Sequence, residues 1–226
     1  GVQTCALPIY SFLGQFSNLR EVYLKGNELT SVPEALTAHL ELEQLSLRGN
    51  PLYLDQASVV RLQRFSHLRA LNLNYCPIGP RLDLSGMRRL VRLNIRATGI
   101  VALPAGLVDC VHLGSLDARN NQIVDIPEAT FIDARAIFRR IQLHDNPLSE
   151  QTRQRAQRIF SDEARQTMGL THYRAHGQVS LSPFSSWLPG LPAENRSARF
   201  AVWNDLLAEQ GSADFFRVLE IGRAHV

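Results

Sequence analysis

The stretch LGSLDARNNQI, residues 113–123, decides the fold of this chain. Apolar residues at 116 and 118 alternate with polar ones, and this period of two predicts a short strand with one buried face. Asparagine then follows at a turn. The same pattern recurs in five other stretches: LREVYLKGNEL (19–29), LEQLSLRGNPL (42–52), LRALNLNYCPI (68–78), LVRLNIRATGI (90–100) and FRRIQLHDNPL (138–148).

The six stretches share a polar position at successive spacings of 23, 26, 22, 23 and 25 residues, which is occupied by Asn27, Asn50, Cys76, Thr98, Asn121 and Asn146. A single unit cannot bury its apolar face alone, so the units must stack and share one core. The pattern resembles a leucine-rich repeat array. This resemblance implies an α/β solenoid with parallel strands on the concave face and short helices or turns on the convex face. We expect the polar side chains to form a structural ladder that bonds to main-chain groups left unpaired by the turns.

The segments between the strands predict the convex side. Proline follows an apolar residue at positions 33, 104 and 127, which suits an extended turn or the first turn of a short helix. Leu36, Leu107 and Phe131 should then point into the core. The repeat that precedes Cys76 is the longest, and its helical apolar phase in ASVVRLQRF (57–65) predicts a longer helix there.

The array is predicted to end at residue 148. Residues 148–168 read as one amphipathic helix with Ser149 as its N-cap and with Ala156, Ile159, Phe160 and Ala164 on one face. A terminal repeat needs a cover with a polar outer face, so residues 149–182 are interpreted as a capping helix and a connector.

The concave face is the candidate binding surface, because alternation along each strand directs polar side chains to it. The residues predicted to bind protein there are Tyr23, Lys25, Arg48, Asn72, Asn74, Arg92, Arg96, Asp117, Arg119, Arg140 and His144. The third position of each strand forms a partly basic stripe suited to an acidic protein surface. A solvated charged face without a partner is the alternative. A net charge of only +3 and little aromatic interleaving argue against nucleic acid.

Residues for catalysis, for a cofactor or for a metal are not predicted. Cys76 and Cys110 lie far apart in no metal-ligand spacing. His172 and His176 are four residues apart, but no carboxylate or thiol completes a ligand set. The sequon at Asn195 falls in a predicted helix. A run of about 20 apolar residues that could span a membrane is also not found.

The stretch WLPGLPAENRSARFAVWNDLLAEQGSADFFRVLE, residues 187–220, changes character. The stretch resembles the start of the catalytic domain of bacterial NEL-type ubiquitin ligases. The resemblance rests on its opening Trp-Leu, on an arginine-containing helix with a central tryptophan, and on Phe-Phe-x-x-Leu. Residues 183–220 would be the truncated start of that helical domain. The resemblance implies a parent protein that is secreted by a bacterium into the host cytoplasm and uses a cysteine to transfer ubiquitin from an E2. That cysteine would lie downstream in a Cys-x-Asp motif, so E2 and ubiquitin are partners of the parent only.

The two ends of the chain are expected to be non-native. GVQTCALPI (1–9) and IGRAHV (221–226) are compatible with opposite strands of one DNA segment that resembles a sequencing adapter. The repeats then occupy residues 10–148, and natural termini are the alternative. Two function classes stay open: the substrate-recognition fragment of an E3 ligase, and a non-enzymatic leucine-rich repeat interaction module.

Overall fold

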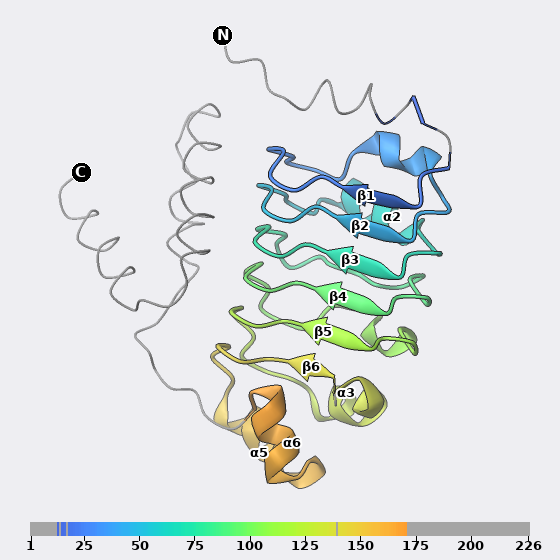
Figure 1. Cartoon of the computed structure of the whole chain (residues 1–226). Helices are drawn as coiled ribbons and strands as arrows, with labels where there is room; N and C mark the ends of the chain where they lie inside the picture. Colours follow the sequence, from blue (N-terminus) through green and yellow to red (C-terminus); the bar gives the residue numbers. More distant parts are fainter. Residues whose placement is uncertain (1–12, 14, 17, 139, 171–226) are drawn as a thin grey trace, which may run out of the picture. The chain divides into compact units, whose positions relative to one another are not determined.

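The computed structural model describes residues 13, 15–16, 18–138 and 140–170, which lie in a compact unit spanning Gly1–Tyr173 (Figure 1). The predicted α-helical C-terminal segment, the ligase-like stretch and the two adapter-like ends lie outside the described residues.

Six short strands form one parallel sheet in sequence order, as the repeat pattern predicted. Figure 1 shows them stacked one repeat after another. The register is regular: the central apolar residues of neighbouring strands pair directly, as Leu45 does with Leu71 and Leu71 does with Leu93. The strands are β1 (Glu21–Tyr23), β2 (Gln44–Ser46), β3 (Ala70–Asn72), β4 (Arg92–Asn94), β5 (Ser115–Asp117) and β6 (Ile141–Gln142).

The core lies behind the sheet, where the inward residue of each strand meets the segments that connect the repeats. The predicted inward residues Leu36, Leu107 and Phe131 are all buried. The connecting elements are the 3-10 helices η1 (Glu34–Ala38) and η2 (Leu107–Asp109) and the α-helices α2 (Gln56–Gln63), α3 (Glu128–Asp133) and α4 (Arg135–Phe138).

The longest connecting helix, α2, confirms the prediction for the longest repeat. The carboxylate of Asp55 caps it by accepting a hydrogen bond from the backbone N–H of Ser58 at 2.7 Å. Val59 and Leu62 are buried, so the helix contributes its apolar face to the common core.

The C-terminal cap consists of two helices, α5 (Glu150–Ile159) and α6 (Asp162–Met168), so the prediction of one continuous helix is wrong. Phe160 adopts an extended conformation, and the hydroxyl of Ser161 accepts from the backbone N–H of Ala164, which starts a second helix. The first start was predicted correctly, because Ser149 accepts from the N–H of Thr152 at 3.1 Å.

The cap closes the end of the solenoid by packing and by main-chain pairing. The rings of Phe131, Phe138 and Phe160 form a cluster with centroids 4.7 to 5.9 Å apart. Beyond β6, the N–H of Leu143 donates to the carbonyl of Met168 at 2.8 Å. The last strand therefore does not present an open edge along this part of its length.

Candidate protein-binding surface

The predicted binding residues lie on one side of the sheet, which we call the open face. It consists of the side chains that alternate with the buried residues of β1–β6 and of the turns that follow these strands. Main-chain hydrogen bonds continue the pairing past the strand ends and align the residue two places after the last open-face residue of each strand. These residues form the basic column: Lys25, Arg48, Asn74, Arg96, Arg119 and His144. The N–H groups of Gly49, Tyr75 and Ala97 donate to the carbonyls of Asn74, Arg96 and Arg119, each at 3.0 Å. Side chains of neighbouring repeats in this column are therefore about 5 Å apart.

Asn74 departs from the prediction. It is only 7% exposed, and its Oδ1 is buried without a hydrogen-bond partner among the described residues. A polar atom in that state costs free energy, so Asn74 is not the freely exposed contact residue that the alternation predicted.

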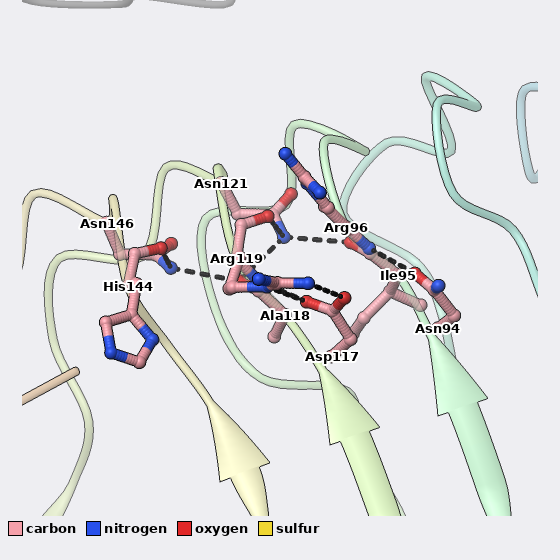
Figure 2. A network of polar contacts seen from close by, with 9 residues as sticks. All are labelled: Asn94, Ile95, Arg96, Asp117, Ala118, Arg119, Asn121, His144 and Asn146. Atoms are coloured by element: carbon pink, nitrogen blue, oxygen red, sulfur yellow. Dashed lines mark hydrogen bonds and ion pairs between the residues drawn. The ribbon is translucent and has the colours of Figure 1, made fainter. Parts of the chain in front are cut away.

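Three side chains in the middle of the face accept hydrogen bonds from the main chain two residues further on. Oδ1 of Asn72 accepts from the N–H of Asn74, Oδ1 of Asn94 accepts from that of Arg96, both at 3.1 Å, and Asp117 does the same for Arg119 at 3.2 Å. Figure 2 shows the Asn94 and Asp117 contacts. A backbone N–H only donates, so the carbonyl oxygen of each asparagine must face it. The amide nitrogens of Asn72 and Asn94 have no partner among the described residues, which leaves them as donors.

Asp117 is neutralised by its neighbour. The guanidinium of Arg119 donates to both carboxylate oxygens, at 2.9 and 2.8 Å, and lies against Asp117 in Figure 2. This hydrogen-bonded pair also raises the pKa of Arg119 above its ordinary value. The only acidic side chain that β3–β5 direct to the open face is therefore paired.

Tyr75 is a candidate residue that the sequence reasoning missed. Its ring is buried between repeats, with the guanidinium carbon of Arg48 5.4 Å from the ring centroid and that of Arg96 6.0 Å away. Cation–π attraction at these distances holds both arginines over the ring. Tyr75 therefore holds the side chains of Arg48 and Arg96 in place in the turns that follow β2 and β4.

The backbone at Tyr75 belongs to a row that repeats along the solenoid. The residue just before each ladder position has a positive φ of 53–65°: Gly26, Gly49, Tyr75, Ala97, Asn120 and Asp145. Glycine, asparagine and aspartate adopt this conformation readily, whereas other residues are strained there. The glycine, asparagine or aspartate present in four of the six repeats is the sequence signal that could have revealed the row.

The first rows of the open face have mixed charge. The hydroxyl of Tyr23 donates to Glu21 at 3.1 Å, and this hydrogen bond raises the pKa of Tyr23. Arg92 donates to Gln44 at 3.4 Å. Lys25 is exposed at this end. An acidic partner would therefore meet a less uniform surface over β1 than over β3 and β4.

The last row belongs to β6 and to the turn after it. Arg140 donates to the carbonyl of Leu113 at 3.5 Å. His144 is exposed, but its backbone lies so close to Gly169 that a β-carbon there would approach His144 N to 2.5 Å. The C-terminal cap thus packs against the main chain of His144, the last residue of the basic column.

The polar ladder residues are buried behind the turns, with the exception of the half-buried Asn27. Asn121 bonds to four main-chain groups within 3.0 Å: its Nδ2 donates to Ile95 and Ala118, and its Oδ1 accepts from Thr98 and Gly99. Asn50 and Asn146 likewise bond to two repeats each. Figure 2 shows Asn121 and Asn146 in this role.

Cys76 and Thr98 make fewer bonds at the same position. The thiol of Cys76 donates to the carbonyl of Leu47 at 3.1 Å, and the hydroxyl of Thr98 donates to that of Ile95 at 2.9 Å. Burial raises the pKa of the Cys76 thiol to about 12 and that of Cys110 to about 11. Both thiols therefore stay protonated at neutral pH.

Within the described part of the chain, no group of three or more His, Cys, Asp or Glu side chains is placed to hold a metal ion. Among those same residues, no helix has the length and apolar character needed to cross a membrane.

Comparison with known proteins relates the chain to leucine-rich repeat structures. A leucine-rich repeat protein of Leptospira interrogans aligns with a TM-score of 0.55 and 22% identity over 68% of this chain and 37% of its own. Internalin C2 of Listeria monocytogenes has a TM-score of 0.45 at 24% identity over 61% and 67% of the two chains. A receptor kinase ectodomain of Arabidopsis thaliana, solved in complex with Casparian strip integrity factor 2, has a TM-score of 0.45 at 27% identity over 60% and 19%.

No family model and no curated protein sequence matches the chain. The Leptospira likeness and the in-register parallel sheet together establish a leucine-rich repeat solenoid. The chain spans about a third of the length of that protein.

Proposed function

We propose that this chain is a protein-recognition module that binds an acidic protein surface through the middle of its open face. The observation that carries the proposal is the chemistry of β3 and β4 and of the turns that follow them. Asn72 and Asn94 keep amide donors that have no partner among the described residues, while Arg92 and Arg96 add positive charge. The neighbouring Asp117 is neutralised by Arg119. A surface that offers hydrogen-bond donors and positive charge selects a partner rich in carboxylates.

Preorganisation supports the same proposal. Arg48 and Arg96 are held over the ring of Tyr75, so fewer of their rotamers would be lost on binding. Buried tyrosine and arginine are also the residue types in which binding energy concentrates at protein interfaces. The strained backbone of Tyr75 is a further mark of a functional position.

The test is selection of peptides from a random displayed library by the full chain. We expect enrichment of aspartate and glutamate, and we expect Arg48→Glu together with Arg96→Glu to abolish it. Arg64→Glu is the matched control, since Arg64 is exposed at the end of α2 and outside the open face. Enrichment without acidic residues, or equal loss in the control, would contradict the proposal.

We further propose that the parent protein is a cysteine-dependent E3 ubiquitin ligase of the NEL type, with these repeats selecting its substrate. Support comes from three sequence motifs in residues 187–220: the Trp-Leu pair, the central tryptophan and Phe-Phe-x-x-Leu. These residues lie outside the described part of the chain. The proposed parent would require E2 and ubiquitin, whereas this chain lacks a Cys-x-Asp motif.

Sequencing the source gene outward from Tyr10 and Glu220 tests the ligase proposal. A frame that continues into a helical domain with a Cys-x-Asp motif supports it. A frame that holds more repeats or stops soon after Glu220 favours the alternative, a non-enzymatic interaction module that would use the same open face.

A further inference from the structure

A second surface lies at the amino ends of the strands, at the other end from Tyr75. It is a groove of about 500 Å³ formed by the turns that lead into the sheet. Its lining residues come from neighbouring repeats: Arg20, Glu41, Glu43, His67, Arg69, Arg89, Val91 and His112.

The main chain fixes the spacing of these side chains. The residue just before each of the strands β1–β4 offers a carbonyl that accepts two N–H groups of the next repeat. The carbonyl of Glu43 accepts from Arg69 and Ala70 at 2.7 and 3.0 Å, and that of Arg69 accepts from Val91 and Arg92 at 2.8 and 2.9 Å. Repeats paired in this way place equivalent side chains about 5 Å apart.

The charges of the groove do not cancel. Its two carboxylates are used at one end: Glu43 pairs with Arg20, and Glu41 pairs with His67 at 2.9 Å. Toward the later repeats, the side chains of Arg69, Arg89 and His112 have no partner within the described part of the chain.

The groove also has room beside Arg69, Arg89 and His112, which line it. The position equivalent to Val91 in the next repeat is Gly114, and a β-carbon there would come no nearer than 3.6 Å to its neighbours. Gly114 therefore adds no side chain at the position where the preceding repeat has Val91. Val91 supplies an apolar wall.

We propose that this groove binds a phosphomonoester, in the form of a phosphorylated side chain of a protein partner. A phosphate ester carries close to two negative charges and three strong acceptor oxygens at neutral pH, which matches two arginine forks and an imidazole. One carboxylate has one charge and two oxygens, so it would leave part of this donor set unpaired. Val91 would contact the aliphatic part of the modified side chain. The site is separate from the open face and does not depend on the function proposed for it.

The experiment uses the full chain and a blocked tripeptide with a central phosphoserine, compared with the same peptide containing serine or glutamate. NMR titration should show binding of the phosphoserine peptide at least tenfold tighter than that of either analogue. Arg89→Gln should weaken that binding at least tenfold. Arg88→Gln is the matched control, because Arg88 is the exposed neighbour that does not line the groove.

Three results would overturn the assignment: equal binding of the glutamate peptide, equal effects of Arg88→Gln and Arg89→Gln, or inorganic phosphate binding as tightly as the phosphopeptide. The last result would place a free anion, not a protein partner, in the groove. Arg48→Glu on the open face should leave phosphopeptide binding unchanged, so failure of either proposed site can be recognised separately. Circular dichroism of each variant confirms that it is folded.

Discussion

Repeats with a buried asparagine at the polar position are joined to their neighbours differently from the two middle repeats, which carry Cys76 and Thr98. One asparagine amide both donates and accepts, so Asn121 joins main-chain groups of two repeats through four bonds within 3.0 Å. A thiol or hydroxyl donates once, and Cys76 and Thr98 each make one bond of 3.1 Å or less to the main chain through their side-chain donors. The main chain of the two middle repeats therefore receives fewer side-chain hydrogen bonds at this position than the main chain beside the buried asparagines Asn50, Asn121 and Asn146.

The same middle repeats depart from the pattern in other ways. Tyr75 and Ala97 occupy the positive-φ row where the other repeats place glycine, asparagine or aspartate. Asn74, beside Tyr75, buries an oxygen without a partner among the described residues. These weaker positions lie behind the part of the open face that offers donors and positive charge. Local rules of stability are most often broken where a protein has a function to perform, and this coincidence supports the site proposed for binding.

The largest loss of stability is expected from Asn121→Leu, which removes a buried amide that joins two repeats. Leucine leaves the N–H groups of Thr98 and Gly99 without their acceptor, while the carbonyls of Ile95 and Ala118 lose one of their two donors. We therefore expect the free energy of unfolding to fall by about 3 kcal/mol. Asn27→Leu is the matched control, because Asn27 is half-buried and its amide donates only to Lys25 at 3.1 Å. It should cost less than about 1 kcal/mol. Urea denaturation measures both, and equal losses would remove the special role of the buried amide.

Alkaline pH should lower the free energy of unfolding by a smaller amount, through ionisation of the Cys76 thiol. The folded-state pKa of Cys76 is about 12 against an ordinary 9.0, so the unfolded chain loses this proton first. Stability is therefore unaffected below about pH 9 and falls as pH rises toward 12. The free energy of unfolding should therefore be about 1 kcal/mol lower at pH 10 than at pH 8 because of this thiol.

The measurement is the difference in unfolding free energy between pH 8 and pH 10 for the native chain and for Cys76→Ala. The variant should lose less stability than the native chain, because it lacks the group that titrates. A variant that loses as much would show that Cys76 is not the source. Thiol reagents should also leave folded Cys76 unmodified at pH 8.

The smallest effect concerns the positive-φ row. Ala97→Gly should stabilise the chain by up to about 1 kcal/mol, since glycine adopts this conformation without a steric cost. The reverse change, Gly26→Ala, should destabilise by a similar amount, even though a β-carbon at Gly26 would meet nothing within 4 Å. Thermal unfolding of the two variants should move in opposite directions; shifts in the same direction would mean that packing, not backbone strain, dominates at this row.

Much of the fold followed from local pattern. The alternation in LEQLSLRGNPL and its relatives located all six strands, and the N-cap Ser149 marked the start of the C-terminal cap. The break at Phe160 and Ser161 was missed because residues on both sides continue one apolar face, so periodicity alone did not distinguish one helix from two. The capping hydroxyl of Ser161 was the available signal.

The candidate site was predicted only in outline. Alternation assigned residues such as Arg48 and Arg96 to one face, since side chains on a strand point in opposite directions in turn. It gave no warning that Asn74 is buried or that Tyr75 lies between two arginines, because both follow from the left-handed turn after β3. The groove around Arg89 combines residues of five repeats and has no local signature.

The repeat, the direction of its strands and the identity of its polar ladder can thus be derived from local pattern, because each depends on spacing along one short segment. Which charged side chains remain available for a partner depends on how the repeats stack. Asp117 is paired within its own repeat, whereas Glu43 is paired with an arginine of the neighbouring repeat and Glu41 contacts His67. Arg69 and Arg89 meet no acid among the described residues. The physical reason is that charge pairing depends on distances between repeats, and these distances exist only once the repeats have stacked.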